Sequence, residues 1–279
     1  MDQNPIISVV VPFYNSWKYI EQTINSVLNQ TFPYYEILIV DDGSKDEESL
    51  KKLEEVGKLD NRIKVFHKDN EGLAATRDFG ASKSADTCKY LMFLDDDDLI
   101  EPTFLECAYW TLETNSEAAW AYSDSIGFGT REYTWNKYFN SEKLKEENEL
   151  ISEALVRKTD FNLVNGYELR EKAVNEDWNL WLKLLANDKY PVHMSFYGQW
   201  YRRKETGELQ KSRDNKTRAL EIIKETASKV TKNIAAIQYP RYNYNYDIIP
   251  AEVEGLLIPK LKENNDNKIN ILMIFPWMI

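Results

Sequence analysis

The sequence predicts an α/β fold: an open, mostly parallel sheet flanked by helices and followed by a C-terminal helical extension. Between residues 6 and 124, short apolar runs alternate with segments of helical period. Most of these runs are continuously apolar, which is typical of parallel strands buried on both faces. Polar residues follow the first, second and fourth runs. Ligands of such sheets bind beyond the carboxyl ends of the strands, so we expect the chemistry at that edge.

Five strands are expected in this first part: IISVVV at 6–11, EILIV at 36–40, IKVFH at 63–67, KYLMFL at 89–94 and AAWAY at 118–122. The segments between them read as helices, since Ile20, Ile24 and Val27 recur on one helical face and a similar pattern follows Pro102. Later expected elements are strands at 151–158 and 193–203, a helix containing Trp178 and a polar helix at 213–236.

These patterns divide the chain into three parts. We expect one domain over residues 1–236, an extension or linker over 237–268, and a fresh apolar strand over 269–279 that opens a further, truncated domain. The polar stretch KENNDN precedes that last strand.

Composition excludes several classes of protein. The 279 residues carry a net charge of −11, which disfavours binding to nucleic acid backbones. Two cysteines, Cys88 and Cys107, form no CxxC pair, so we expect neither a disulfide framework nor a zinc site, and a reducing compartment such as the cytoplasm fits. The N-terminus lacks a basic leader, and no apolar stretch approaches the roughly 18 residues of a membrane span. Contact with a membrane is therefore expected only at its surface.

Four consecutive aspartates, Asp95–Asp98, directly follow the apolar run YLMFL. Crowded carboxylates repel one another unless a positive charge lies among them. If the segment is extended, Asp95 and Asp97 share one face and can hold a hard divalent cation such as Mg²⁺ or Mn²⁺. A solvated acidic turn, or acids favoured by a helix N-terminus near Pro102, is the alternative.

Three other groups of residues are candidates for the site. Asp41 and Asp42 end the second strand, Arg77 follows a glycine turn at the start of a helix, and Glu176 and Asp177 occupy the first turn of another helix. Arginine suits a diphosphate, and an acid at a helix N-terminus can act as a general base. Each also has a plain structural alternative: capping, a surface ion pair, or interaction with the helix dipole.

The order and spacing of these motifs resemble the family 2 glycosyltransferases of the GT-A fold. The resemblance covers residues 6–204 and runs through VVVPFYN, IVDDGS, NEGLAATRDFG, YLMFLDDDDLI, NEDWNLWLKL and WYRR in that order. Taken singly the motifs are weak, whereas their succession is specific.

The resemblance implies a role for each matching residue. Pro12, Phe13, Tyr14 and Asp41 would line the nucleotide base pocket, Arg77 would lie near the diphosphate, and Asp95 and Asp96 would face the ribose and phosphates. Asp97, with Asp95, would hold Mn²⁺ or Mg²⁺, and Arg202 and Arg203 would add contacts to the diphosphate or the metal. Asp177 would be the catalytic base, and Glu176 would orient it.

Some positions depart from the family pattern. Asp78 replaces the usual asparagine of ARN, Asn165 replaces one glycine of a pair, and Lys204 stands where the family often has a histidine. The terminal segment INILMIFPWM also looks like the opening strand of a GT-B glycosyltransferase domain.

The implied function is metal-dependent, inverting transfer of a sugar from a nucleoside diphosphate, with UDP expected, to a hydroxyl of a glycan or lipid-linked acceptor. Synthesis of bacterial surface polysaccharide at the inner face of the cytoplasmic membrane is the family's common setting. One alternative is a catalytically silent GT-A module that binds or positions a partner domain. A sugar nucleotidyltransferase is a weaker alternative, because VPFYNS after the first strand contains no glycine for a phosphate loop.

Overall fold

The computed structural model describes residues 4–136, 138–167, 175–204, 216–233, 237–238, 248–253 and 256–261. The chain divides into two compact units, Met1–Arg241 and Tyr242–Ile279. In the second unit, β11 (Ile248–Val253) and β12 (Leu256–Leu261) form an antiparallel hairpin within the segment expected to be an extension. The strand expected at 269–279 lies outside the described residues, so the three-part division and the GT-B resemblance remain predictions.

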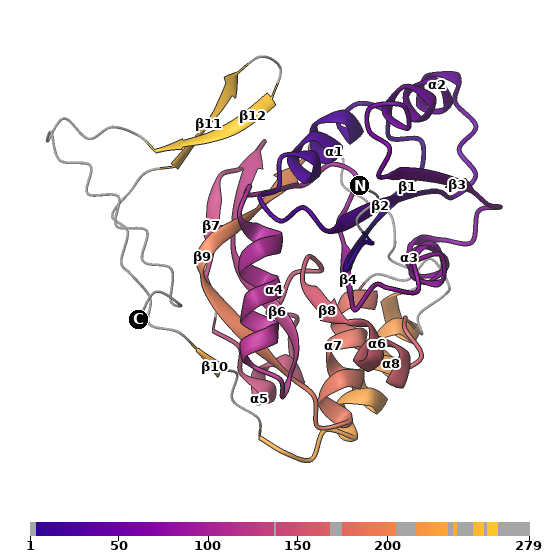
Figure 1. Cartoon of the computed structure of the whole chain (residues 1–279). Coiled ribbons are helices and arrows are strands. Elements are labelled where there is room, and N and C mark those ends of the chain that lie inside the picture. The colour runs from indigo at the N-terminus through magenta and orange to yellow at the C-terminus, as the bar shows by residue number, and fades with distance from the viewer. Residues whose placement is uncertain are drawn as a thin grey trace, which may run out of the picture. The chain divides into compact units, whose positions relative to one another are not determined.

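A curled, open sheet forms the first unit (Figure 1). Its strands are β1 (Ile7–Phe13), β2 (Tyr35–Asp41), β3 (Ile63–His67), β4 (Tyr90–Phe93), β5 (Leu99–Ile100), β6 (Ala118–Gly129), β7 (Tyr133–Trp135), β8 (Leu155–Arg157), β9 (Tyr190–Arg203) and β10 (Ile237–Gln238). The main order is β10-β9-β6-β8-β4-β1-β2-β3, with β5 paired to β9 and β7 to β6.

Parallel pairing joins β1 to β2 and β4, β2 to β3, and β6 to β9, which confirms the predicted open and mainly parallel sheet. The strand β8 is inserted antiparallel between β4 and β6. Because of this direction, the residues that precede β8 lie beside the residues that follow β4. The antiparallel insertion was not predicted, and it shapes the site described below.

Helices cover both faces of the sheet (Figure 1). They are α1 (Ile20–Leu28), α2 (Glu47–Val56), α3 (Leu73–Ser82), α4 (Phe104–Thr114), α5 (Ser141–Leu144), α6 (Lys158–Leu163), α7 (Glu176–Ala186) and α8 (Lys216–Ser228). One core contains Val9 of β1 with residues of α1, α2 and α4, whereas the other contains Val10 with residues of α3, α6, α7 and α8. Successive β1 residues thus face opposite cores, as a strand covered on both sides requires.

The helix α3 packs closely on β1. A Cβ added at Gly80 would lie 2.3 Å from Val10 Cγ1, so only glycine permits this approach. Gly72, with φ of +93°, begins the helix in a conformation that disfavours other residues. Together these glycines fix where Arg77, in the middle of α3, meets the sheet.

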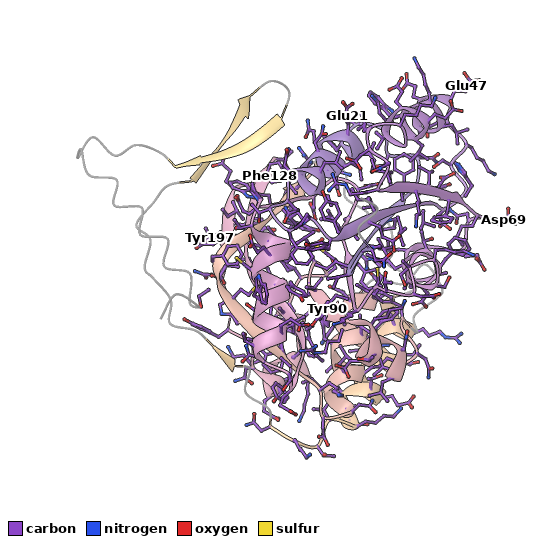
Figure 2. The ribbon with its side chains drawn as sticks, viewed as in Figure 1. Glu21, Glu47, Asp69, Tyr90, Phe128 and Tyr197 are labelled. Carbon is purple, nitrogen blue, oxygen red and sulfur yellow. The ribbon has the colours of Figure 1, made fainter. Side chains whose placement is uncertain are left out.

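Charged side chains such as Glu47 and Asp69 lie at the periphery of this unit, whereas Tyr90 of β4 is buried (Figure 2). Among the described residues, no helix combines the length and the apolar character that crossing a membrane requires.

Candidate active site

The four aspartates form a turn. The chain leaves β4 at Phe93, and the Asp98 N–H donates to the Asp95 carbonyl at 3.2 Å. The extended alternation expected for this segment, with Asp95 and Asp97 on one face, is therefore wrong. The physical reason is long-range, because β5 begins at Leu99 and pairs antiparallel with β9, which requires the chain to change direction after β4.

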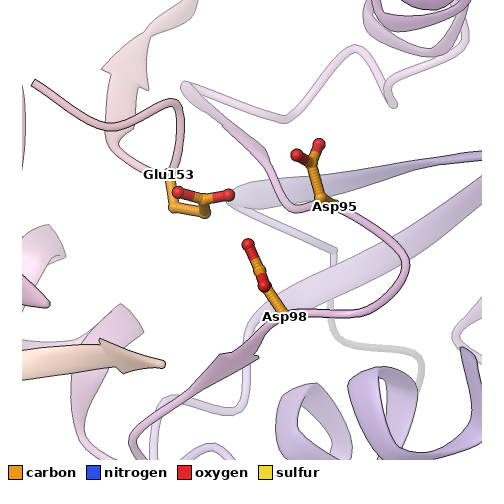
Figure 3. Close-up of side chains that lie close together, drawn as sticks. All are labelled: Asp95, Asp98 and Glu153. Atoms are coloured by element: carbon orange, nitrogen blue, oxygen red, sulfur yellow. The ribbon is translucent and has the colours of Figure 1, made fainter. Parts of the chain in front are cut away.

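The turn brings Asp95 and Asp98 together with Glu153, which the sequence did not single out. One carboxylate oxygen from each of the three lies within 4.8 Å of the others. Figure 3 shows the Asp98 and Glu153 carboxyl groups facing each other beside Asp95. Glu153 comes from the segment before β8, whose antiparallel pairing with β4 carries it to this place. A sequence signal for it exists in retrospect: an acid within the apolar run ISEALV.

In the acidic cluster of Asp95, Asp98 and Glu153, one buried carboxylate oxygen has no hydrogen-bond partner among the described residues. Asp98 is 2% exposed, and its Oδ1 accepts from the Arg202 N–H at 2.6 Å, whereas its Oδ2 is buried and has no partner among the described residues. Burial and the charge of Glu153 raise the pKa of Asp98 well above its usual value. Burial and the charge of Asp95 raise the pKa of Glu153 to about 7. A cation placed here would be stabilised by the same charges.

Asp97 has a different partner. Its Oδ2 lies 2.6 Å from Lys204 Nζ, so a fixed positive charge stands beside the aspartate expected to bind the metal. Burial raises the pKa of Asp97 although Lys204 opposes this shift. Burial and the neighbouring Asp97 also raise the pKa of Asp96.

Arg77 joins the acidic turn to the start of α7. Its side chain is 1% exposed, its Nη2 donates to Asp95 Oδ1 at 2.5 Å, and its Nη1 donates to Glu176 Oε1 at 2.6 Å. Burial alone would lower the pKa of Arg77, yet the charges of Asp95 and Glu176 raise it well above the usual value. Sequence reasoning placed this residue near a diphosphate; here its guanidinium holds two segments of the site together.

The first turn of α7 presents two carboxylates. Burial, together with the charge of Asp177, raises the pKa of Glu176 to about 7. Asp177 is half-buried; its Oδ1 accepts from the Trp178 N–H at 2.8 Å and its Oδ2 from Asn148 Nδ2 at 3.0 Å. Burial also raises the pKa of Asp177, and Arg77 and the Asn148 hydrogen bond oppose that rise. Asn148 is a second site residue that sequence reasoning missed.

At the carboxyl ends of β1 and β2, Asp41 is buried, and its two oxygens are already engaged. Oδ1 accepts from the Ser44 N–H at 2.9 Å and Oδ2 lies 2.9 Å from His67 Nδ1. Phe13 is paired in register with Asp41 and is buried, whereas Tyr14 is 46% exposed. Asp41 thus closes a turn in the loop before α2, whereas the cap of that helix is Asp46, whose side chain accepts from the Ser49 N–H. The contact of Asp41 with a nucleotide base stays a prediction.

The two arginines at the end of β9 differ in their surroundings. Arg202 is buried; its Nε donates to the Asp97 carbonyl at 2.7 Å, and its guanidinium lies 4.1 Å from the centre of the Tyr19 ring. It therefore supports the backbone of the acidic turn. Arg203 is half-buried and lies over the ring of Tyr133 at 5.5 Å.

Comparison with known proteins places this geometry in a family. Residues 8–166 match the family described as Glycosyl transferase family 2, which is more than half of the 279 residues. The chain belongs to glycosyl transferase family 2. The matched range contains Asp41, Arg77 and the acidic turn.

Curated relatives match part of this family 2 chain. An uncharacterized glycosyltransferase of Rickettsia conorii is 44% identical over 110 residues, which are 39% of this chain and 18% of the relative. The putative glycosyltransferase EpsH of Bacillus subtilis is 41% identical over 104 residues, 37% of this chain and 29% of the relative. The chain thus aligns with less than a third of the length of either relative.

Solved structures agree with the GT-A fold of the family 2 chain. Residues 1–349 of TarS from S. aureus, in complex with UDP-GlcNAc, superpose with a TM-score of 0.68 at 20% identity, covering 81% of this chain and 67% of that one. GalNAc-T7 with UDP, GalNAc and Mn²⁺ gives a TM-score of 0.59 at 19% identity, covering 72% and 44%. At such identities the likeness establishes the fold alone.

Proposed function

We propose that the chain is an inverting, nucleotide-sugar-dependent glycosyltransferase in which Asp177 is the general base. The observation that carries the proposal is the bridge through Arg77, which holds Asp95 of the acidic turn and Glu176 of α7 on one guanidinium. A donor-binding turn and a base must lie at one edge of the sheet for such a reaction, and this bridge supports that arrangement.

The donor would be a UDP-linked sugar, in keeping with the UDP-GlcNAc complex of TarS and the UDP complex of GalNAc-T7. Its base would lie against Pro12, Phe13 and Tyr14, with Asp41 accepting from the base edge. Asp95 and Asp96 would face the ribose and phosphates. Arg203 is the arginine of the WYRR segment with more exposed surface, so we propose it for contacts to the diphosphate in preference to the buried Arg202.

A divalent ion, Mn²⁺ or Mg²⁺, would be held at the acidic turn. The residues fit such an ion: the donor set consists of carboxylate oxygens, which hard cations prefer, and Asp98 Oδ2 is buried without a partner among the described residues. Asp95 and Asp97 are the proposed ligands, and Asp98 and Glu153 bring further oxygens close to Asp95. When bound, the ion would neutralise charge that develops on the departing diphosphate.

Asp177 would remove the proton from the acceptor hydroxyl. As the O–H bond breaks, the hydroxyl oxygen would form a bond to the anomeric carbon, and the bond from that carbon to the diphosphate oxygen would break on the opposite face. A single displacement of this kind inverts the configuration. Glu176, held by Arg77 at 2.6 Å, would fix the first turn of α7 and so the position of its neighbour.

The acceptor would be a glycan or a lipid-linked glycan of the bacterial surface, which would bring the chain to the inner face of the cytoplasmic membrane. This part of the proposal follows from the resemblance to the family.

Incubation with a panel of sugar nucleotides tests the proposal. Release of free nucleoside diphosphate from one donor, in the presence of Mn²⁺, is the expected result. Asp177→Asn should retain donor affinity within about twofold and lose at least about 100-fold in turnover, because a general base contributes about 10²- to 10⁴-fold. Absence of release from every donor would favour the catalytically silent module, and normal turnover by Asp177→Asn would exclude Asp177 as the base.

A further inference from the structure

We propose that Asn148 is a positioning residue that fixes the carboxylate of Asp177; this inference rests on the proposed function. Asn148 Nδ2 donates to Asp177 Oδ2 at 3.0 Å, and Asn148 Oδ1 accepts from the Leu150 N–H at 3.3 Å. The amide oxygen of Asn148 thus accepts a hydrogen bond within its own loop, while the amide nitrogen points toward the carboxylate of Asp177. Among side chains of this size, asparagine alone offers both functions in fixed relation.

The loop that carries Asn148 is anchored on both sides. On one side, the Trp178 indole Nε1 donates to the Leu144 carbonyl at 2.5 Å, and Leu144 is buried in the core. On the other side, the Trp135 indole Nε1 donates to the Glu149 carbonyl at 3.0 Å. Asn148 therefore lies between two backbone anchors, which hold its side chain in the direction of α7.

Two donors from two different segments hold the base. The Trp178 N–H, at 2.8 Å, engages Oδ1 of Asp177, while Asn148 engages Oδ2. Rotation of the carboxylate would break both hydrogen bonds. Each oxygen keeps further acceptor capacity for an incoming hydroxyl, since a carboxylate oxygen accepts more than one hydrogen bond. The consequence is a base with a fixed orientation in a half-buried position.

The same hydrogen bond favours the ionised carboxylate. Other charged or titratable groups near Asp177 are Arg77 from α3, Asp95 from the acidic turn, Glu176 from its own helix and Tyr167 from the loop after α6. Burial raises the pKa of Asp177, and the donor from Asn148 opposes that rise. Loss of the donor should therefore move the acidic limb of the rate profile toward higher pH.

The test compares two substitutions of Asn148 in the full 279-residue chain. Asn148→Asp keeps the size and the acceptor for Leu150 but places a carboxylate where the donor was; Asn148→Gln keeps an amide donor. We expect Asn148→Asp to lower kcat by about 10- to 100-fold with the donor KM within about twofold, since misplacement of a reacting group by about 1 Å costs about 100-fold. Its acidic limb should move upward in pH, and Asn148→Gln should recover part of the rate.

Asn140→Asp is the matched control. Asn140 lies eight positions earlier and caps α5, its Oδ1 accepting from the Glu142 and Lys143 N–H groups at 2.9 and 3.1 Å, a role that aspartate can keep. Wild-type kcat and pH profile in Asn148→Asp, or an equal loss in Asn140→Asp, would overturn the inference. Full turnover by Asp177→Asn would instead refute the proposed base. If Asn148→Asp melts earlier than the wild type, wild-type kinetics in Asn148→Ala would equally overturn the inference.

Discussion

Arg77 and Glu176 lie 99 positions apart in the sequence, yet Arg77 Nη1 donates to Glu176 Oε1 at 2.6 Å in a fully buried position. The other arm of the same guanidinium donates to Asp95. One cation thus ties the helix α3, the acidic turn and the helix α7 together. Removing it leaves the buried Glu176 and the half-buried Asp95 without their counter-charge.

Arg77→Met should therefore lower the free energy of unfolding by about 3 to 5 kcal/mol, the usual cost of removing one partner of a buried ion pair. Urea denaturation at neutral pH measures it. Lys51→Met is the control: Lys51 Nζ lies 3.9 Å from Glu55 Oε1 and its side chain is 80% exposed, so its loss should cost at most about 1 kcal/mol. Equal losses in the two variants would show that the buried bridge contributes no special stability.

Asp97→Ala should abolish the part of the UDP affinity that depends on Mn²⁺, because the proposed ion binds the donor through this turn. Calorimetric titration of UDP with and without Mn²⁺ measures that difference. Asp86→Ala, an exposed aspartate that precedes β4, serves as the control and should leave it unchanged. If Mn²⁺ still increases the UDP affinity of Asp97→Ala, the ion is bound by the other carboxylates, Asp95, Asp98 and Glu153.

Lys204→Met should strengthen the binding of Mn²⁺. The Lys204 ammonium lies 2.6 Å from Asp97 Oδ2 and competes with an ion for the same oxygen. Electron paramagnetic resonance of free Mn²⁺ gives the dissociation constant directly, without reference to activity. Lys51→Met, a substitution at a side chain that is 80% exposed on α2, controls for the loss of one positive charge. Weaker binding of Mn²⁺ by Lys204→Met than by Lys51→Met would contradict the proposed competition between Lys204 and Mn²⁺ for Asp97.

The sheet could be predicted from the sequence because its central strands are continuously apolar. Every residue of β1 and β2 is buried, and their carboxyl ends lie side by side, with Phe13 paired to Asp41. For these strands the local run of apolar residues was sufficient to predict the structure. The motif order in the sequence also identified the family, which the match over residues 8–166 confirmed.

The interior of the site could not be predicted in the same way. The turn at Asp95–Asp98 depends on the pairing of Leu99 with Trp200, and the approach of Glu153 depends on the antiparallel direction of β8. Neither pairing leaves a local periodic signal. Asn148 reaches Asp177 across 29 positions from a loop with no regular pattern, so only the folded chain reveals it.

Glu153→Gln should change how stability depends on pH. In the native state burial and the charge of Asp95 raise the pKa of Glu153 from 4.5 to about 7. Between these two values the native chain keeps a proton that the unfolded chain has released, so the wild type loses stability as the pH rises through that window. Glutamine does not titrate, and the variant lacks this contribution.

The free energy of unfolding of Glu153→Gln relative to the wild type should therefore increase from pH 4.5 to pH 8, by on the order of 3 kcal/mol for a group so fully buried. Glu176, whose pKa is also about 7, titrates in the same window in both proteins, and its contribution cancels in the difference to the extent that the two sites act independently. The contribution of Asp98 does not cancel, because the charge of Glu153 raises its pKa, but its loss in the variant changes the difference in the same direction. Urea denaturation at intervals across that range, with a chelator present to remove divalent ions, measures the difference. Glu47→Gln, at an exposed position on α2, controls for the loss of a carboxylate. If the difference in the free energy of unfolding between Glu153→Gln and the wild type is constant across the window, Glu153 is ionised in the native cluster. The interpretation of Asp98 and Glu153 as an acidic site without a counter-charge would then be wrong.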